Sequence, residues 1–324
     1  MTATDPRRAD DAAIALTPRR LTHANLFVAD WQKSFAFYRD VVGLNESYTR
    51  PPFKAGFLTN GATHHDIAVM EFSPRYWTRA PRPIGLFHVA FEMEHDLALC
   101  RWHDRALKLG VEFSMIEDHR NTHSLYMYDP DGNQIEVYVD TLKDWTIIKS
   151  GTIQWMNREW RPWDPPPTTE TFYIERPVYT RVEAAPFHPL HTTHAVFAAR
   201  DYPAMVRFYT EVVGLKLVAG GLDRPFVALQ GALGDRSVSI FRAGPEFEPG
   251  FHHVGLLARN ERDLERSIAR ARAQGVAIEA VVDHPVRLSV MIRDLDGHRV
   301  QLYAERDGTI DWVRLDPTLA IHVV

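Results

Sequence analysis

An internal repeat constrains the fold of this chain more than any other feature of its sequence. The stretch HANLFVADWQKSFAFYRDVVGL (23–44) recurs as HAVFAARDYPAMVRFYTEVVGL (194–215), a shift of 171 positions. The stretch FHVAFEMEHDLALCRWHDRALKLGVEF (87–113) recurs as HHVGLLARNERDLERSIARARAQGVAI (252–278), a shift of 165 positions. Because each half again contains two similar stretches, we interpret the chain as four related units in two pairs.

Each unit is predicted to form one strand, one helix and then further strands. The first unit begins with the alternation of a half-buried strand over 23–28. Asp30 suits the N-cap of the helix that follows, and Gly43 suits a left-handed C-cap after about three turns. Later strand-like runs are separated by turn signals such as DPDG (129–132). We therefore expect an α+β fold with four βαβββ units paired into two domains.

The repeat boundaries divide the 324 residues into four parts. They are an N-terminal tail (1–20), a first domain (21–140), a connecting segment (141–185) and a second domain (186–324). The connecting segment is rich in Trp and Pro, and its PPP run is too rigid for a helix. We expect this segment to pack against the first domain.

Charge and composition exclude several classes of function. The net charge is -5, the isoelectric point is near 6.3, and the Lys and Arg residues are scattered, which argues against a nucleic-acid surface. The single cysteine, Cys100, cannot build a disulfide framework. No apolar run reaches the roughly 18 residues of a membrane span, and residues 1–20 contain only a short apolar run. We expect a cytoplasmic protein with small-molecule partners that forms a homo-oligomer through its exposed sheet edges.

Three polar side chains are predicted to converge on the concave side of the first domain. Glu136 lies between Ile135 and Val137 on a strand, so it faces away from the apolar core. The same alternation places His23 and His88 on that face. A single inward histidine is more often a hydrogen-bonded core residue, but three such groups together indicate a metal, because unpaired buried charge is costly. Two imidazoles and one carboxylate suit a non-haem Fe(II) site with open positions for substrate and dioxygen.

With these residues placed, the chain resembles the two-domain type I extradiol ring-cleavage dioxygenases of the vicinal oxygen chelate superfamily. The resemblance covers nearly the whole chain and implies that His23, His88 and Glu136 are metal ligands. It also implies that Asn25, in the family's H-x-N motif, lies beside the metal. The expected cofactor is Fe(II), with Mn(II) as the alternative, and the expected substrates are a small aromatic diol and dioxygen.

Two further motifs carry the resemblance. THHDIAV (63–69) is similar to the family's strand with the acid/base histidine, here His65. In HRNTHSLYMYDPDGNQIEVY (119–138), His119 and Tyr128 resemble the substrate-pocket pair of that family. A metal-chelating catechol must lose a proton, which an imidazole with a pKa near 6.5 can accept. The alternatives are a structural role for His65 and an aromatic core position for Tyr128.

Other residues are less specific candidates for the pocket. His64, Thr122 and His123 lie within the same motifs. Arg158 and Arg161 could reach a substrate carboxylate through their guanidinium groups, or they could pair with acidic groups on the surface.

The second half of the chain lacks the chemical groups of the first. The repeat shifts replace four residues: Asn25 becomes Val196, His65 becomes Arg236, Tyr128 becomes Arg293 and Glu136 becomes Gln301. His194 and His253 remain, but an amide oxygen is a weaker ligand than a carboxylate. We therefore expect the N-terminal domain to be catalytic, the reverse of the order in most two-domain members of the family.

Two other classes of function stay open on this scaffold. A glyoxalase-like isomerase or thiol transferase would use a further carboxylate from the first unit, where this chain has His65. Asp66 is predicted to point to the opposite face, and Glu71 lies too far along the strand. A ligand-sequestering protein of the bleomycin-resistance type would need neither His65 nor the pair His119 and Tyr128.

Overall fold

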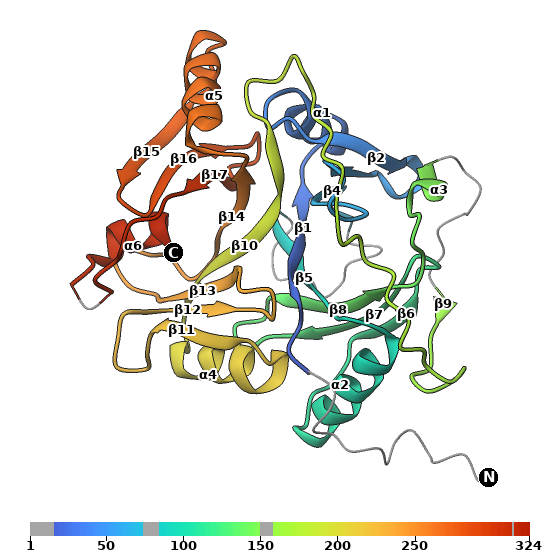
Figure 1. Cartoon of the computed structure of the whole chain (residues 1–324). Helices are drawn as coiled ribbons and strands as arrows, with labels where there is room; N and C mark the ends of the chain where they lie inside the picture. Colours follow the sequence, from blue (N-terminus) through green and yellow to red (C-terminus); the bar gives the residue numbers. More distant parts are fainter. Residues whose placement is uncertain (1–15, 74–83, 150–157, 313) are drawn as a thin grey trace.

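The computed structural model describes residues 16–73, 84–149, 158–312 and 314–324. These residues form two sheets with helices packed on them (Figure 1), in the order β2-β3-β4-β1-β5-β8-β7-β6-β9 for the first and β11-β12-β13-β10-β14-β17-β16-β15 for the second. The prediction of an α+β fold built from paired βαβββ units is confirmed.

The first sheet and its helices come from the N-terminal half of the chain. Its strands are β1 (Arg20–Val28), β2 (Asn45–Arg50), β3 (Ala55–Thr59), β4 (Ile67–Glu71), β5 (Gly85–Glu92), β6 (Met115–Asp118), β7 (Thr122–Tyr128), β8 (Gln134–Asp140) and β9 (Arg158–Glu159). Its helices are α1 (Trp31–Asp40), the 3-10 turn η2 (Pro51–Phe53), α2 (Asp96–Lys108) and α3 (Thr146–Lys149).

The second sheet repeats this arrangement. Its strands are β10 (Pro189–Ala199), β11 (Lys216–Gly220), β12 (Phe226–Gln230), β13 (Arg236–Arg242), β14 (Gly250–Ala258), β15 (Ile278–His284), β16 (Arg287–Arg293) and β17 (Arg299–Glu305). Its helices are α4 (Tyr202–Arg207), which continues as the π-helical η3 (Phe208–Val213), α5 (Glu261–Ala273) and α6 (Pro317–Val323).

The centre of each sheet joins two units. In the first sheet, β1 pairs in parallel with β4 of its own unit and antiparallel with β5, and β5 pairs in parallel with β8. In the second sheet β10, β13, β14 and β17 pair in the same way. Strands β1, β5 and β8 are therefore neighbours in the middle of the first sheet, where the predicted ligands lie.

Alternation along β1 separates the two faces of the first sheet. Leu26 and Val28 pack with Phe35 of α1 in the main core, whereas Phe27 belongs to a separate cluster. The side chain of Asp30 accepts hydrogen bonds from two backbone N–H groups of the first turn of α1, as an N-cap does. This burial directs the polar residues of the sheet centre away from the helices.

Parts of the connecting segment lie against the first domain. Ile148 of α3 packs in the cluster that contains Phe27, β9 pairs with β6, and Trp160 is buried in the main core. The main core also contains side chains from both domains, so the two sheets share one continuous apolar interior.

Reciprocal hydrogen bonds hold the two domains together. Tyr38 on α1 donates to Asp294 Oδ2 at 3.1 Å, and its repeat counterpart Tyr209 donates to Asp129 Oδ2 at 3.2 Å. The two aspartates belong to the repeated DPDG and DLDG turns. Each turn therefore serves the opposite domain, a role that turn chemistry alone does not reveal.

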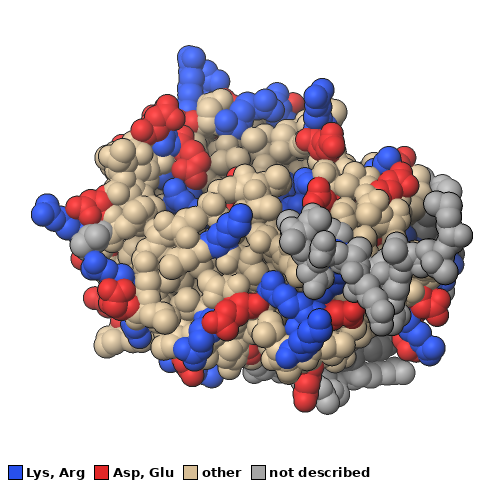
Figure 2. Space-filling model, turned by 60° about the horizontal axis from the view of Figure 1, so that its bottom comes forward, with Lys and Arg blue, Asp and Glu red and all other residues tan. Residues whose placement is uncertain are grey.

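Two further features of the described residues are the distribution of surface charge and the character of the helices. Figure 2 shows basic and acidic side chains intermixed over one face of the molecule. Among the helices in the described part of the chain, none has both the length and the apolar character needed to cross a membrane.

Candidate metal centre

Three neighbouring strands bring the predicted ligands together. His23 on β1 and His88 on β5 point their Nε2 atoms at Glu136 Oε2 on β8, at 3.0 and 3.1 Å. All three side chains are buried, and one ligand atom from each lies within 4.8 Å of the others. The sheet thus presents two imidazoles and one carboxylate on one face.

The charge state of this group suits a divalent cation. Burial alone would raise the pKa of Glu136, but its contacts with His23 and His88 outweigh burial and hold the pKa well below the usual value. Burial lowers the pKa of His23 to about 4. Both His88 ring nitrogens are buried without a hydrogen-bond partner, although Nε2 lies near Glu136. A metal ion would coordinate the lone pair of His88 Nε2, so the residues fit the cofactor that the pattern implies.

His65 and Asn25 form a pair beside the ligands. His65 Nε2 lies 3.0 Å from Asn25 Oδ1, and the His65 ring stacks against His23 with centroids 3.9 Å apart. Because the Asn25 oxygen can only accept, the hydrogen resides on Nε2 and Nδ1 keeps a lone pair. His65 Nδ1 is buried without a partner, and burial lowers the pKa of this ring well below 6.5. His65 is therefore a neutral imidazole with one available basic nitrogen.

The structure corrects the position of the pocket tyrosine. Tyr126 donates to Glu136 Oε1 at 2.9 Å, and His119 Nε2 lies 3.0 Å from the same hydroxyl. Tyr128 lies on the same face of β7, two residues further along, beside Asp129 and outside the pocket. The signal was available in the sequence, because pairing outward from the DPDG turn sets residue 126 opposite residue 136.

Most of the residues described above line one pocket. One wall is apolar, and the rest is polar or charged. The lining consists of Asn25, Tyr48, Arg50, Phe57, His64, His65, Met70, Phe87, His88, Met115, Glu117, His119, Asn121, Thr122, Tyr126 and Glu136. Among the charged members, Glu117 has its pKa raised to about 7, mainly by burial. Sequence reasoning missed Tyr48, Arg50 and Glu117 because nothing in their local patterns marks the mouth of a pocket.

The remaining candidates divide into two groups. His64 and Thr122 line the pocket. His123 does not, because it stacks on Trp160 with centroids 4.4 Å apart and pairs with an aspartate of α2. Of the tail arginines, Arg158 pairs with an acidic group on β6 and Arg161 with one on β9, and neither lines the pocket.

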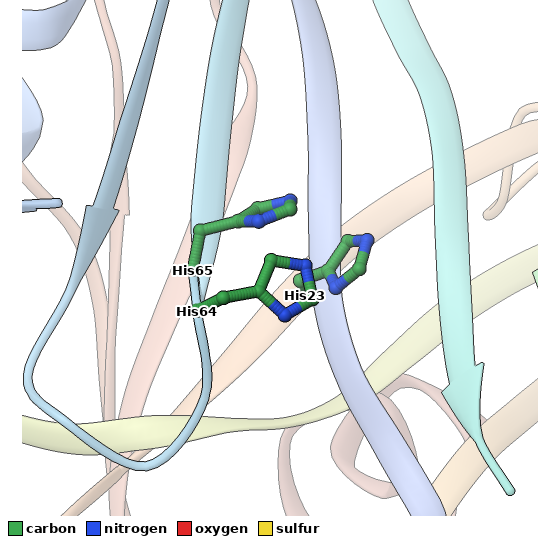
Figure 3. Close-up of side chains that lie close together, drawn as sticks. All are labelled: His23, His64 and His65. Carbon is green, nitrogen blue, oxygen red and sulfur yellow. The ribbon is translucent and has the colours of Figure 1, made fainter. Parts of the chain in front are cut away.

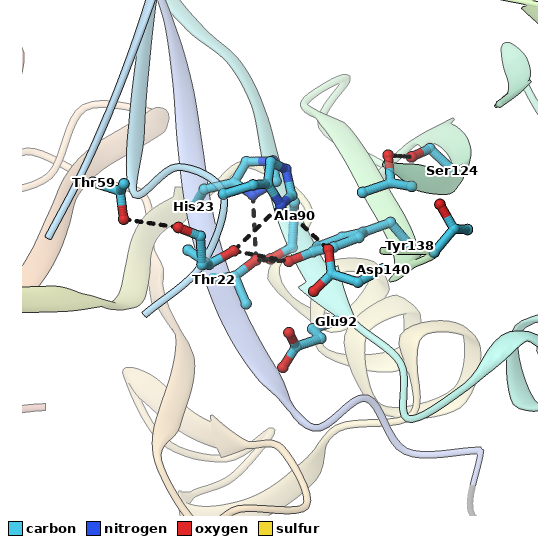
Figure 4. A network of polar contacts seen from close by, with 12 residues as sticks. Thr22, His23, Thr59, Ala90, Glu92, Ser124, Tyr138 and Asp140 are labelled. Carbon is cyan, nitrogen blue, oxygen red and sulfur yellow. Dashed lines mark hydrogen bonds and ion pairs between the residues drawn. The ribbon is translucent and has the colours of Figure 1, made fainter. Parts of the chain in front are cut away.

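A polar network supports the ligands from behind. Tyr138 donates to Thr22 Oγ1 at 3.0 Å, and that oxygen lies 3.3 Å from His23 Nδ1 (Figure 4). The second domain keeps the same support, since Tyr303 and Thr193 lead to His194 in the same way. The scaffold behind the first ligand is therefore common to both domains.

In the second domain an arginine lies beside Gln301, the repeat counterpart of Glu136. The buried Arg287 places Nη1 3.5 Å from Gln301 Oε1, and its guanidinium lies 3.8 Å from the Tyr303 ring centroid. Ile321 of α6 packs on the same face of this sheet. Within the described residues, no third imidazole or carboxylate joins His194 and His253 to complete a ligand set. A fixed positive charge at this point opposes metal binding.

The comparisons with known proteins agree with this architecture. The model of the Glyoxalase/Bleomycin resistance protein/Dioxygenase superfamily matches residues 20–137 and 191–302, and the chain belongs to that superfamily. The chain is 34% identical over 135 residues to biphenyl-2,3-diol 1,2-dioxygenase 3 of Rhodococcus globerulus, covering 39% of this chain and 66% of that relative, just under two-thirds of its length.

Two solved structures share the whole fold. The Mn(II)-bound glyoxalase of Novosphingobium aromaticivorans has a TM-score of 0.67 and 15% identity over 94% of this chain and 89% of its own. The 2,3-dioxygenase LapB of Pseudomonas sp. KL28 has a TM-score of 0.67 and 16% identity over 92% of this chain and 96% of its own. At such identities the likeness concerns the fold, so the choice of reaction depends on the site.

Proposed function

We propose that this protein is an extradiol dioxygenase that cleaves a catechol at an Fe(II) site in its N-terminal domain. The observation that carries the proposal is the convergence of the ligand set with one pocket, which His88, Glu136, His65 and the hydrogen-bonded pair Tyr126 and His119 all line. The name of the Rhodococcus relative, which states an aromatic diol as its substrate, supports it.

His23, His88 and Glu136 would hold the iron, and Mn(II) is the alternative for the same donors. When bound, the metal would supply the open coordination positions at which the diol and dioxygen meet. The carboxylate contributes the single negative charge of the ligand set.

The side chains around the ligands divide the remaining work. His65 accepts a proton from the diol, while its hydrogen bond to Asn25 fixes the orientation of the ring. The Tyr126 hydroxyl donates to Glu136 Oε1 and lies 3.0 Å from His119 Nε2, so this pair orients the carboxylate beside the diol. Phe57, Met70 and Phe87 provide the apolar wall for the aromatic ring.

The residues expected of the competing isomerase do not reach the site. Asp66 faces the other way, where its carboxylate accepts hydrogen bonds from Thr59 and from the backbone of Thr192. Glu71 pairs with Lys54 and does not line the pocket. The isomerase would need a carboxylate as its fourth metal ligand. The neutral His65 occupies the position from which that carboxylate would come.

A direct assay tests the proposal. The protein is loaded anaerobically with Fe(II) and given catechol, 3-methylcatechol, 2,3-dihydroxybiphenyl or homoprotocatechuate in air. A yellow ring-cleavage product with one dioxygen consumed per ring is the expected result. Stoichiometric metal without colour or oxygen uptake for any of the four diols would refute the proposal and favour the isomerase or the binding protein.

A further inference from the structure

A second group of metal-ligating side chains lies directly beside the first. The rings of His23, His64 and His65 converge from β1 and from the chain entering β4 (Figure 3). One nitrogen from each lies within 4.8 Å of the others, and all three side chains are buried. The ring centroids of His64 and His65 are 4.5 Å apart, and those of His23 and His64 are 5.4 Å apart.

We propose that His23, His64 and His65 form a second metal position, for a borderline-soft divalent cation such as Zn²⁺, which overlaps the first position at His23. Three imidazoles with an open fourth position for water form an established zinc geometry. A site without a carboxylate offers little to the hard, oxygen-preferring cations.

The lone pair on His65 Nδ1 is the strongest support for this position. That nitrogen is fully buried and has no hydrogen-bond partner, while Nε2 is occupied by Asn25. An orphaned imidazole nitrogen in a protein interior is costly unless something coordinates it. His64 contributes in a second way, because the Asp140 carboxylate lies 3.4 Å from its Nδ1. A carboxylate beside a metal-binding imidazole orients the ring and raises its basicity as a ligand.

Pocket access supplies the fourth position. His64 and His65 both line the pocket, so a cation held by this cluster can keep a water or a pocket ligand. Zinc bound in this position would take the Nδ1 lone pair of His65 and would inhibit ring cleavage. That consequence rests on the proposed function, whereas the binding itself does not.

The test separates the two positions in the Glu136→Gln variant, in which the first position has lost its carboxylate. Zn²⁺ binding is measured by equilibrium dialysis on this variant alone and after addition of His64→Gln or of His88→Gln. We expect the parent variant to keep one equivalent of Zn²⁺. His64→Gln should lower its zinc affinity at least tenfold, and the matched His88→Gln should change it less than threefold.

Two results would overturn the inference. One is a Glu136→Gln variant that binds no zinc, and the other is a loss of zinc binding with His88→Gln but not with His64→Gln. A single His64→Gln variant that still binds Mn²⁺ as the wild type does shows that the fold and the first position are intact. These binding data do not depend on ring cleavage, so they remain valid if the proposed reaction is wrong.

Discussion

Replacing Tyr126 with Phe tests the corrected geometry of the pocket. The hydroxyl donates to Glu136 Oε1 at 2.9 Å and lies 3.0 Å from His119 Nε2, so the change removes both contacts from a buried site. A hydrogen bond to a charged group contributes about 1.5–3 kcal/mol. At about 1.4 kcal/mol for each factor of ten, loss of this contribution in the transition state lowers kcat/KM about 10- to 150-fold.

The matched control is Tyr128→Phe, which removes the same atom from the same face of β7 outside the pocket. We expect this control to change kcat/KM less than about threefold. Oxygen uptake with the best diol measures the rate, and metal content is determined for each variant. A large loss of kcat/KM for Tyr128→Phe with little effect of Tyr126→Phe would refute the placement of Tyr126 in the active pocket.

The remaining predictions concern the acid/base group, pH dependence and the domain junction. His65→Gln should keep the Fe(II) content and lower kcat by about 10²- to 10⁴-fold, which metal analysis and single-turnover kinetics check. Burial raises the pKa of Asp66 from 3.8 to about 6. The folded protein therefore binds this proton more tightly than the unfolded chain, and the Asp66 contribution to the free energy of unfolding falls by about 2 kcal/mol from pH 4 to 6. Urea titrations should show that Asp66→Asn loses this dependence, and equal slopes for both proteins would contradict it. Trp102, fully buried, donates to Val213 O at 3.2 Å. Trp102→Ala should cost about 3–5 kcal/mol in urea titrations, against less than about 0.5 kcal/mol for the exposed Leu107→Ala.

Local pattern was enough to predict the parts of the structure that depend on strand period and on the repeat. Alternation around Ile135 and Val137 gave the direction of Glu136, and the repeat shift gave the four units. Asp30 caps the start of α1 with its side chain, as expected. Gly43, beyond the end of the helix, has a φ of +85°.

The parts that sequence reasoning missed depend on contacts between distant segments. The motif spacing indicates Tyr128 as the pocket tyrosine. The register of the hairpin is set by its turn, however, and it pairs Tyr126 with Glu136. His123 has the composition of a pocket residue, but Trp160 from the connecting segment covers it. Arg287 places its guanidinium beside Gln301 in the second domain. This contact is visible only once the strand of Arg287 is paired with the strand of Gln301.

The reciprocal tyrosine–aspartate contacts at the domain junction indicate a structural role for the second domain. A chain cut in the connecting segment would leave the Tyr38 hydroxyl and the Asp129 carboxylate without their partners from the other half. The same cut would expose to water the apolar side chains of the core that the two domains share, which destabilises the fragment. A fragment that ends after the first domain would therefore not be a smaller version of the enzyme. The second domain acts as a covalently tethered subunit that completes the fold of the half in which we propose the metal site.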